Sequence, residues 1–138
     1  MISKPFQPRP IRPREAVVIT RLLKVAASNS SVSPTLLSSI DRLVVRDRCD
    51  CDQNGFAPCD SIFFDNPRNM SRPIASGVGH MRNHTAVELI LWAREDVITF
   101  LEVEPYNGAR LPIFLPVVET IQSYPDHIVE PAEEDEEA

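Results

Sequence analysis

The sequence has little glycine and no motif that is built on it. Only 4 of the 138 residues are glycine. A phosphate-binding loop or a dinucleotide-binding fingerprint needs several closely spaced glycines, and none are spaced in that way. No apolar run approaches the ~20 residues of a membrane helix. Prolines and arginines interrupt the N-terminal stretch that would be apolar in a signal peptide. We therefore expect a cytoplasmic protein with no membrane partner and none of these nucleotide-binding motifs.

Charge is concentrated at the two ends of the chain. Residues 130–138 contain six acids and no base, and removing these six from the 20 acids leaves 14, which matches the 14 lysines and arginines. The first fourteen residues contain no acid and carry Lys4, Arg9, Arg12 and Arg14. One interpretation is two solvated tails, and the other is that a tail contacts a charged partner or the opposite tail. The basic arm is short and poor in aromatics, so nucleic acid is not expected as a partner.

The first part of the sequence predicts two helices. Pro13 suits the first turn of a helix, and apolar residues then recur at helical spacing to about residue 27. Ser33 followed by Pro34 predicts the start of a second, short helix to about residue 40. Residues 41–49 and 61–65 predict two paired strands. Residues 66–84 have no period and predict a long loop.

Residues 85–105 predict a β-hairpin, because two apolar and β-branched runs flank the polar triplet Arg-Glu-Asp. A three-residue loop would place Leu89 opposite Leu101 and Glu88 opposite Glu102. A two-residue loop would pair acidic with apolar residues. Because a one-residue slip moves every side chain to the other face, the three-residue loop is favoured. One face is then apolar throughout, and the other is apolar near the turn and acidic at its far end.

These elements predict an α+β fold with two N-terminal helices packed on a four-stranded, mainly antiparallel sheet. The chain divides into an extended Pro- and Arg-rich arm (1–12), a single α+β domain (13–125) and an acidic tail (126–138) that we expect to be disordered. The two prolines of residues 111–116 allow an extended segment or an edge strand, and one or two helical turns can follow to residue 124. The helices should cover the hairpin face that bears Val87, Leu89, Leu91, Leu101 and Val103.

Three cysteines form the most noticeable cluster. Cys49, Cys51 and Cys59 could bind zinc with His84 or His80 as the fourth ligand, although the spacing is not that of a zinc knuckle. Free thiols, or a disulfide of Cys59 with Cys49 or Cys51, are the alternatives. A catalytic thiol assembled from Cys59, His84 and an acid such as Asp60 is a further one. We expect no cofactor as the default.

The acidic end of the hairpin is the candidate partner-binding surface. Opposed like charges destabilise a strand pair, so the first interpretation is that Arg46 or Arg48 neutralises the carboxylates. A basic protein partner is the second interpretation, and acid–base chemistry in a pocket is the third. The residues that we predict to contact a partner are Glu88, Glu102, Glu104, Trp92 and Tyr106.

Two motifs carry a resemblance. The first is Cys49-Asp50-Cys51 after a Leu-Val-Val strand, and the second is Phe-Leu-Glu-Val-Glu-Pro-Tyr at residues 100–106. This pattern resembles small, uncharacterised bacterial α+β proteins with a Cys-x-Cys strand end and a Leu-Glu-Val-x-Pro-Tyr strand end, over roughly residues 13–118. The resemblance implies an α+β fold. It carries over no catalytic or binding residue, because such proteins commonly have no assigned activity.

The sequence thus favours a non-enzymatic binding protein that recognises another, basic protein through an acidic surface. Immunity proteins and other inhibitors are small acidic proteins of this kind, and electrostatic complementarity would give association rate and specificity. A metal- or thiol-dependent site on the cysteines and histidines is one alternative. A structural homo-oligomer is another, with Trp92, Ile98, Ile90 and Phe100 forming a dimer interface.

Overall fold

A computed structural model describes residues 6–26, 34–49, 59–65, 70–106 and 112–123. The elements follow in the order β1 (Arg9–Pro10), α1 (Pro13–Ala26), α2 (Pro34–Ser39), the 3₁₀ helix η1 (Ile40–Arg42), β2 (Val44–Val45), β3 (Asp47–Arg48), β4 (Ile62–Phe63), β5 (Arg72–His80), β6 (Ala86–Arg94), β7 (Val97–Pro105), the 3₁₀ helix η3 (Val118–Thr120) and β8 (Gln122–Ser123). Both predicted helices are present, and the α+β class is confirmed. No helix in these ranges is long and apolar enough to cross a membrane.

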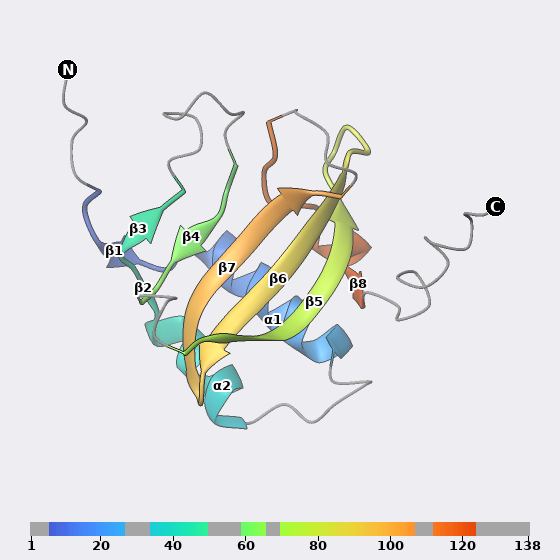
Figure 1. The fold of residues 1–138 in the computed structure, drawn as a ribbon. Coiled ribbons are helices and arrows are strands. Elements are labelled where there is room, and N and C mark those ends of the chain that lie inside the picture. The colour runs from blue at the N-terminus through green and yellow to red at the C-terminus, as the bar shows by residue number, and fades with distance from the viewer. Residues whose placement is uncertain (1–5, 27–33, 50–58, 66–69, 107–111, 124–138) are drawn as a thin grey trace, which may run out of the picture.

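The main sheet has six strands in the order β3-β4-β7-β6-β5-β8, with every neighbouring pair antiparallel (Figure 1). The prediction of four strands is therefore wrong. The two strands that it omitted are β5 and β8. β1 and β2 form a separate two-stranded sheet that ties the N-terminal arm to the segment after η1.

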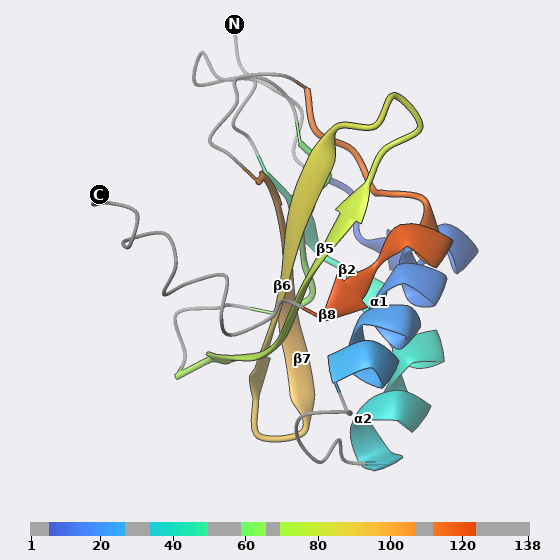
Figure 2. The ribbon, with the colours of Figure 1, turned by 90° about the vertical axis from the view of Figure 1, so that its right-hand side faces the viewer.

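Helices α1 and α2 lie on one side of the sheet (Figure 2). The apolar stripe of α1 is buried there, with Ile19, Leu22 and Leu23 at most 1% exposed. The five hairpin residues expected to face the helices are equally buried: Val87, Leu89, Leu91, Leu101 and Val103. Since each large aliphatic side chain contributes about 1.5–3 kcal/mol when it is removed from water, this layer is the main source of stability.

The hairpin register differs from the prediction near the turn. Arg94 pairs with Val97, so the loop has two residues and not three. The register then shifts at a β-bulge, where Thr99 is the extra residue, and Leu91 pairs with Leu101. From Trp92 and Phe100 to the far end of the hairpin, the bulge keeps the apolar residues on the predicted face, although the loop and the partners are wrong. Glu88 consequently lies opposite Glu104 and not Glu102. Beside the turn the predicted faces are wrong: Ile98, expected with Trp92 on the outer face and in the dimer interface, is buried (1% exposed), whereas Val97 is 46% exposed.

Hydrogen bonds of Thr99 stabilise the bulge. The carbonyl oxygen of Thr99 accepts hydrogen bonds from the backbone N–H groups of Phe64 (2.8 Å) and Asp65 (3.1 Å). Its side chain is fully buried, and its hydroxyl is hydrogen-bonded to that of Ser71 at 2.8 Å. A polar side chain on the apolar side of the sheet is thereby satisfied.

β5, of nine residues, lies within the segment 66–84 that the sequence predicted to be a loop, so that prediction is wrong for residues 72–80. Its glycines alternate on the helix side, where there is no room for a side chain. A Cβ atom on Gly77 would lie 2.5 Å from the carbonyl oxygen of Gln122 and 2.9 Å from Leu22 Cδ1. A Cβ atom on Gly79 would lie 2.8 Å from Pro116 Cβ. These residues are therefore strand glycines at close approaches, and they misled the prediction because glycine usually marks a turn.

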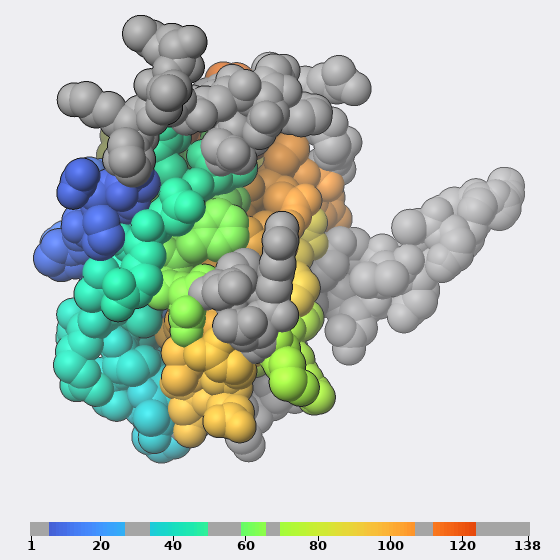
Figure 3. Space-filling model, turned by 60° about the vertical axis from the view of Figure 1, so that its left-hand side comes forward, coloured from blue at the N-terminus to red at the C-terminus, as the bar shows by residue number. Residues whose placement is uncertain are grey.

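The remaining predictions divide between the described and the undescribed parts. β3 and β4 pair as expected, although residues 41–49 are split between two sheets by β2 and β3. Segment 112–117 is extended with Ile113 and Leu115 buried, and η3 supplies the expected helical turn. Figure 3 shows residues 6–12 beside 44–49, with β4 and β7 next across the surface. The whole acidic tail (126–138), which we expect to be disordered, lies outside the described residues.

Candidate functional site

The face of the sheet that points away from α1 has a distinct composition. No helix or strand of the described residues lies over it (Figures 1 and 2). We call this surface the open face. Its side chains are all half-buried, and they come from four neighbouring strands: Phe63, Ser76, Val78, Glu88, Ile90, Trp92, Phe100, Glu102 and Glu104.

The centre of the open face is aromatic. Phe63 of β4 lies directly opposite Phe100 of β7, and the two rings stack with centroids 4.3 Å apart and an interplanar angle of 7°. Trp92 of β6 lies on the other side of Phe100. The indole Nε1–H of Trp92 donates a 3.0 Å hydrogen bond to Glu102 Oε1, which fixes the ring beside the acidic end. Rigid rings with one polar atom are typical anchors of protein interfaces.

The far end of the open face gathers three carboxylates. Glu88 pairs directly with Glu104, and Glu102 is two residues before Glu104 on the same face of β7. A hydrogen bond with Glu102, burial, and the negative charges of Glu102 and Glu88 raise the pKa of Glu104 to about 7. Burial and the charge of Glu102 also raise the pKa of Glu88. This acidic end therefore holds a proton that comes off close to neutral pH.

The structure does not bring the expected arginines to this cluster. Arg46 and Arg48 are exposed beside β3, at the sheet edge two strands away from β7. Within the described ranges the only ion pairs join Arg9 to Glu15 and Arg94 to Asp65. The interpretation that Arg46 or Arg48 neutralises the cluster is therefore wrong for the part of the chain that is described.

Four of the five predicted partner-binding residues lie on the open face. These are Trp92 and the three glutamates. Tyr106 follows β7 directly, is half-buried, and donates its backbone N–H to the carbonyl oxygen of Ala86 (3.2 Å). It therefore stands at the acidic end of the hairpin.

The cysteines and histidines do not converge in the described residues. Cys49 directly follows β3 and Cys59 precedes β4, while Cys51 lies outside the described ranges. His80 ends β5, which is three strands from β4 in the sheet order, or about 14 Å at the ~4.8 Å strand spacing. His84 lies in the β5–β6 turn with a φ of 73°. Among the residues described, no group of three His, Cys, Asp or Glu side chains could hold a metal ion.

The structure also does not bring together the catalytic thiol site proposed for Cys59, His84 and Asp60. The Asp60 carboxylate accepts the backbone N–H of Leu115 (Oδ2 to N, 2.8 Å), and Cys59 Sγ donates to Ser61 Oγ at 3.5 Å. Each of these groups thus has a structural contact of its own. Because His84 is in the distant turn, it does not supply a base to Cys59.

Sequence reasoning missed a second surface, a cleft between the N-terminal arm, the start of α1 and the start of β4. It is lined by residues that include Arg9, Arg12, Arg14 and Arg48. The signal in the sequence is the acid-free stretch 1–14, for which we gave two interpretations: a solvated tail, or a tail that contacts a charged partner or the opposite tail. Nothing in the sequence indicated that Arg48 would join the other three.

Comparisons with known proteins gave no match: no family model matches the chain, and neither the curated proteins nor the solved structures contain a matching protein. The resemblance to small bacterial α+β proteins therefore stays a prediction.

Proposed function

We propose that this chain is a non-enzymatic binding protein whose open face docks a basic protein partner. The observation that carries the proposal is the placement of three carboxylates beside an aromatic centre on a sheet face that no other described element covers. Immunity proteins and protein inhibitors are the functional class that this surface resembles in size and charge.

The energetics support a charged partner of opposite sign. Directly opposed like charges cost a strand pair about 0.2–1 kcal/mol, so the Glu88–Glu104 pair works against folding. A lysine or arginine placed between these carboxylates would replace that repulsion with charge-assisted hydrogen bonds. Steering by the acidic end would raise the association rate, and salt would reduce it.

The aromatic centre supplies the apolar part of the contact. Trp92, Phe63 and Phe100 are rigid, half-buried and adjacent, which suits the desolvated centre of an interface. Trp92 is the only tryptophan in the chain, so its fluorescence reports on this surface alone.

Site-specific photo-crosslinking in the native host tests the proposal. A benzophenone amino acid at Ile90, in the middle of the open face, should capture one stoichiometric protein. The matched control places it at Val17, which is 49% exposed on α1 and belongs to the opposite side of the molecule. Capture at both positions, or at neither, would contradict the proposal.

The nature of the captured protein gives a second readout. The proposal expects a different, basic protein whose binding to the purified chain weakens with salt and strengthens between pH 6 and pH 8, as Glu104 loses its proton. A second copy of this chain as the captured protein would instead support the structural homo-oligomer and overturn the proposal.

A further inference from the structure

The arginine-lined cleft is a built concavity at the start of α1. It has a volume of about 580 Å³, within the range of small-molecule sites. Four arginines from two separate stretches of sequence line it, together with the acids Glu15 and Asp60. The four arginines and two acids give the cleft a formal charge of +2, whereas the whole chain has a formal charge of -6.

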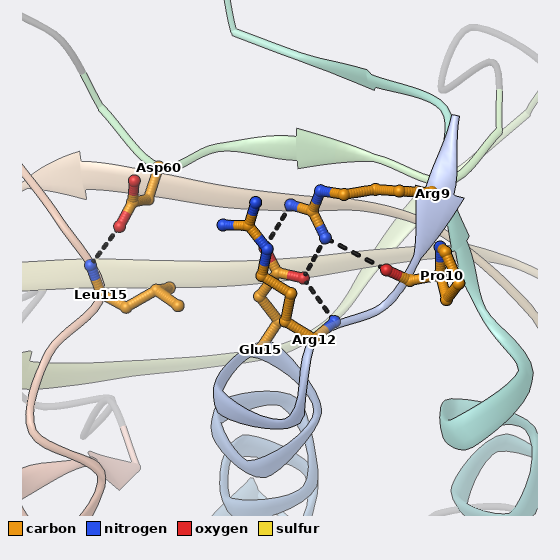
Figure 4. Close-up of polar contacts among 6 residues, drawn as sticks. All are labelled: Arg9, Pro10, Arg12, Glu15, Asp60 and Leu115. Atoms are coloured by element: carbon orange, nitrogen blue, oxygen red, sulfur yellow. Dashed lines mark hydrogen bonds and ion pairs between the residues drawn. The ribbon is translucent and has the colours of Figure 1, made fainter. Parts of the chain in front are cut away.

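Most of this charge is held in place by the fold. Arg9 makes a two-pronged ion pair with Glu15, with Nη2 to Oε2 at 2.7 Å and Nη1 to Oε1 at 3.0 Å, and its Nη1 also donates to the carbonyl oxygen of Pro10 (Figure 4). Arg14 Nη2 donates to the carbonyl oxygen of Leu115 at 3.0 Å. Glu15 Oε1 also accepts the backbone N–H of Arg12 at 2.9 Å. Glu15 therefore neutralises Arg9 and positions the first turn of the helix.

The guanidinium groups of Arg12 and Arg48 can bind a ligand. Both residues are exposed, and neither makes an ion pair within the described ranges. Arg48 Nη1 donates one long hydrogen bond (3.4 Å) to the carbonyl oxygen of Cys49, and this contact does not neutralise its charge. The other acid, Asp60, accepts the backbone N–H of Leu115 at 2.8 Å (Figure 4). The N-terminal end of α1, a 14-residue helix, adds its partial positive charge to the same cleft.

Apart from Cys59 and Ser61, the rest of the lining is apolar. Phe6, Ile62, Phe114 and Leu115 contribute to the cleft, and Phe114 is 42% exposed. An exposed phenylalanine that lines the same cleft as these guanidinium groups can stack on a flat apolar group while the arginines hold an anion.

We infer that this cleft binds a small phosphomonoester with an aromatic body, with the phosphate between Arg12 and Arg48 and the aromatic body against Phe114. A phosphate dianion matches the surplus of two charges and offers three terminal oxygens to the guanidinium forks. A carboxylate carries half that charge and fewer acceptor atoms. The site is separate from the open face and does not depend on the proposed function.

Calorimetry and two-dimensional NMR on the full chain at pH 8 and low salt test the inference, with phenyl phosphate as the probe. Inorganic phosphate tests the anion alone, phenol tests the aromatic body alone, and benzoate tests a carboxylate in place of the phosphate. We expect saturable binding of phenyl phosphate, at least tenfold tighter than that of any of the other three compounds. The NMR shifts should map to Arg12, Arg48 and Phe114.

A matched pair of variants tests the arginines. Arg12→Gln with Arg48→Gln should weaken phenyl phosphate binding at least tenfold, because one charge-assisted hydrogen bond changes affinity by about ten- to a hundredfold. Arg42→Gln with Arg72→Gln removes the same charge from two exposed arginines outside the cleft and should leave binding unchanged. Equal losses of affinity in the two double variants would overturn the inference. So would the absence of saturable phenyl phosphate binding at millimolar concentration, or NMR shifts that map elsewhere. Binding of inorganic phosphate or benzoate as tight as that of phenyl phosphate would also overturn it.

Discussion

Replacing Glu104 by Gln should stabilise the protein at alkaline pH and leave its stability nearly unchanged at acid pH. In the folded chain the pKa of Glu104 is about 7, against an ordinary value of 4.5, because Glu102, burial and Glu88 disfavour its charged form. The folded state therefore holds a proton that the unfolded state has released. The resulting loss of stability is absent below pH 4.5, grows between pH 4.5 and about 7, and is constant above.

The size of this change in stability follows from the difference between the two pKa values of Glu104. At about 1.4 kcal/mol for each pH unit, the interval from 4.5 to about 7 sets an upper limit of about 3.5 kcal/mol. The side chain is half-exposed, so solvent screening reduces the realistic figure to about 1 kcal/mol. Glu104→Gln should thus raise the free energy of unfolding by about 1 kcal/mol at pH 8 and by much less at pH 4.5.

Urea unfolding followed by Trp92 fluorescence at the two pH values measures this difference directly. Glu119→Gln on η3 is the control, because it removes one carboxylate from the part of the molecule that packs beside α1. A stabilisation by Glu104→Gln that is the same at both pH values would refute the reasoning, and so would an equal gain in the control. A carbon NMR titration that finds an ordinary pKa for Glu104 would refute it independently.

Three further predictions concern the core and the arm. Leu89→Ala should lower the free energy of unfolding by about 2–5 kcal/mol in chemical denaturation, because the side chain is fully buried under α1. Gly77→Ala should lower the thermal stability by the equivalent of about 1–3 kcal/mol, because its Cβ would lie 2.5 Å from the backbone oxygen of Gln122. Glu15→Gln should cost about 2 kcal/mol at pH 7, because it leaves Arg9 without its partner, and the cost should shrink as pH falls below 4.5.

The pKa of Glu15 determines how the stability cost of Glu15→Gln changes with pH. Burial alone would raise the pKa of Glu15, but the hydrogen bonds from Arg9 and the Arg12 N–H, with the charges of both arginines, together hold it below its usual value. The pair therefore stabilises the fold above pH 4.5 and loses that contribution in acid. A Glu15→Gln cost that is independent of pH would contradict this account. For Gly77, a Ser76→Ala substitution on the open face is the matched control and should be nearly neutral.

The parts of the fold whose sequence has a strong hydrophobic periodicity were predictable. The apolar spacing of α1 and the alternation of the central hairpin identified both elements and the buried face. The helix began at Pro13 as expected because a missing N–H has no cost in the first turn. The acidic and aromatic ends of the open face follow from the same alternation, so Trp92 and the glutamates could be named in advance.

The predictions that failed concern elements that depend on contacts between segments distant in the sequence. β5 was hidden because Gly77 and Gly79 resemble turn residues, and only the close approach of Leu22, Gln122 and Pro116 explains them. The bulge at Thr99, and with it the two-residue loop, is accompanied by hydrogen bonds to Phe64, Asp65 and Ser71, which no local pattern encodes. The arginine cleft needs Arg48 to meet the N-terminal arm, a contact that pairing of β1 with β2 makes possible.

The central claim is that the acidic end of the open face recognises a basic partner, and the affinity of a charge-neutralised variant for the crosslinked partner tests it most directly. Glu88→Gln, Glu102→Gln and Glu104→Gln combined should weaken binding at least tenfold at pH 8 and low salt, and should remove most of its salt dependence. An unchanged affinity, with the salt dependence retained, would contradict the account.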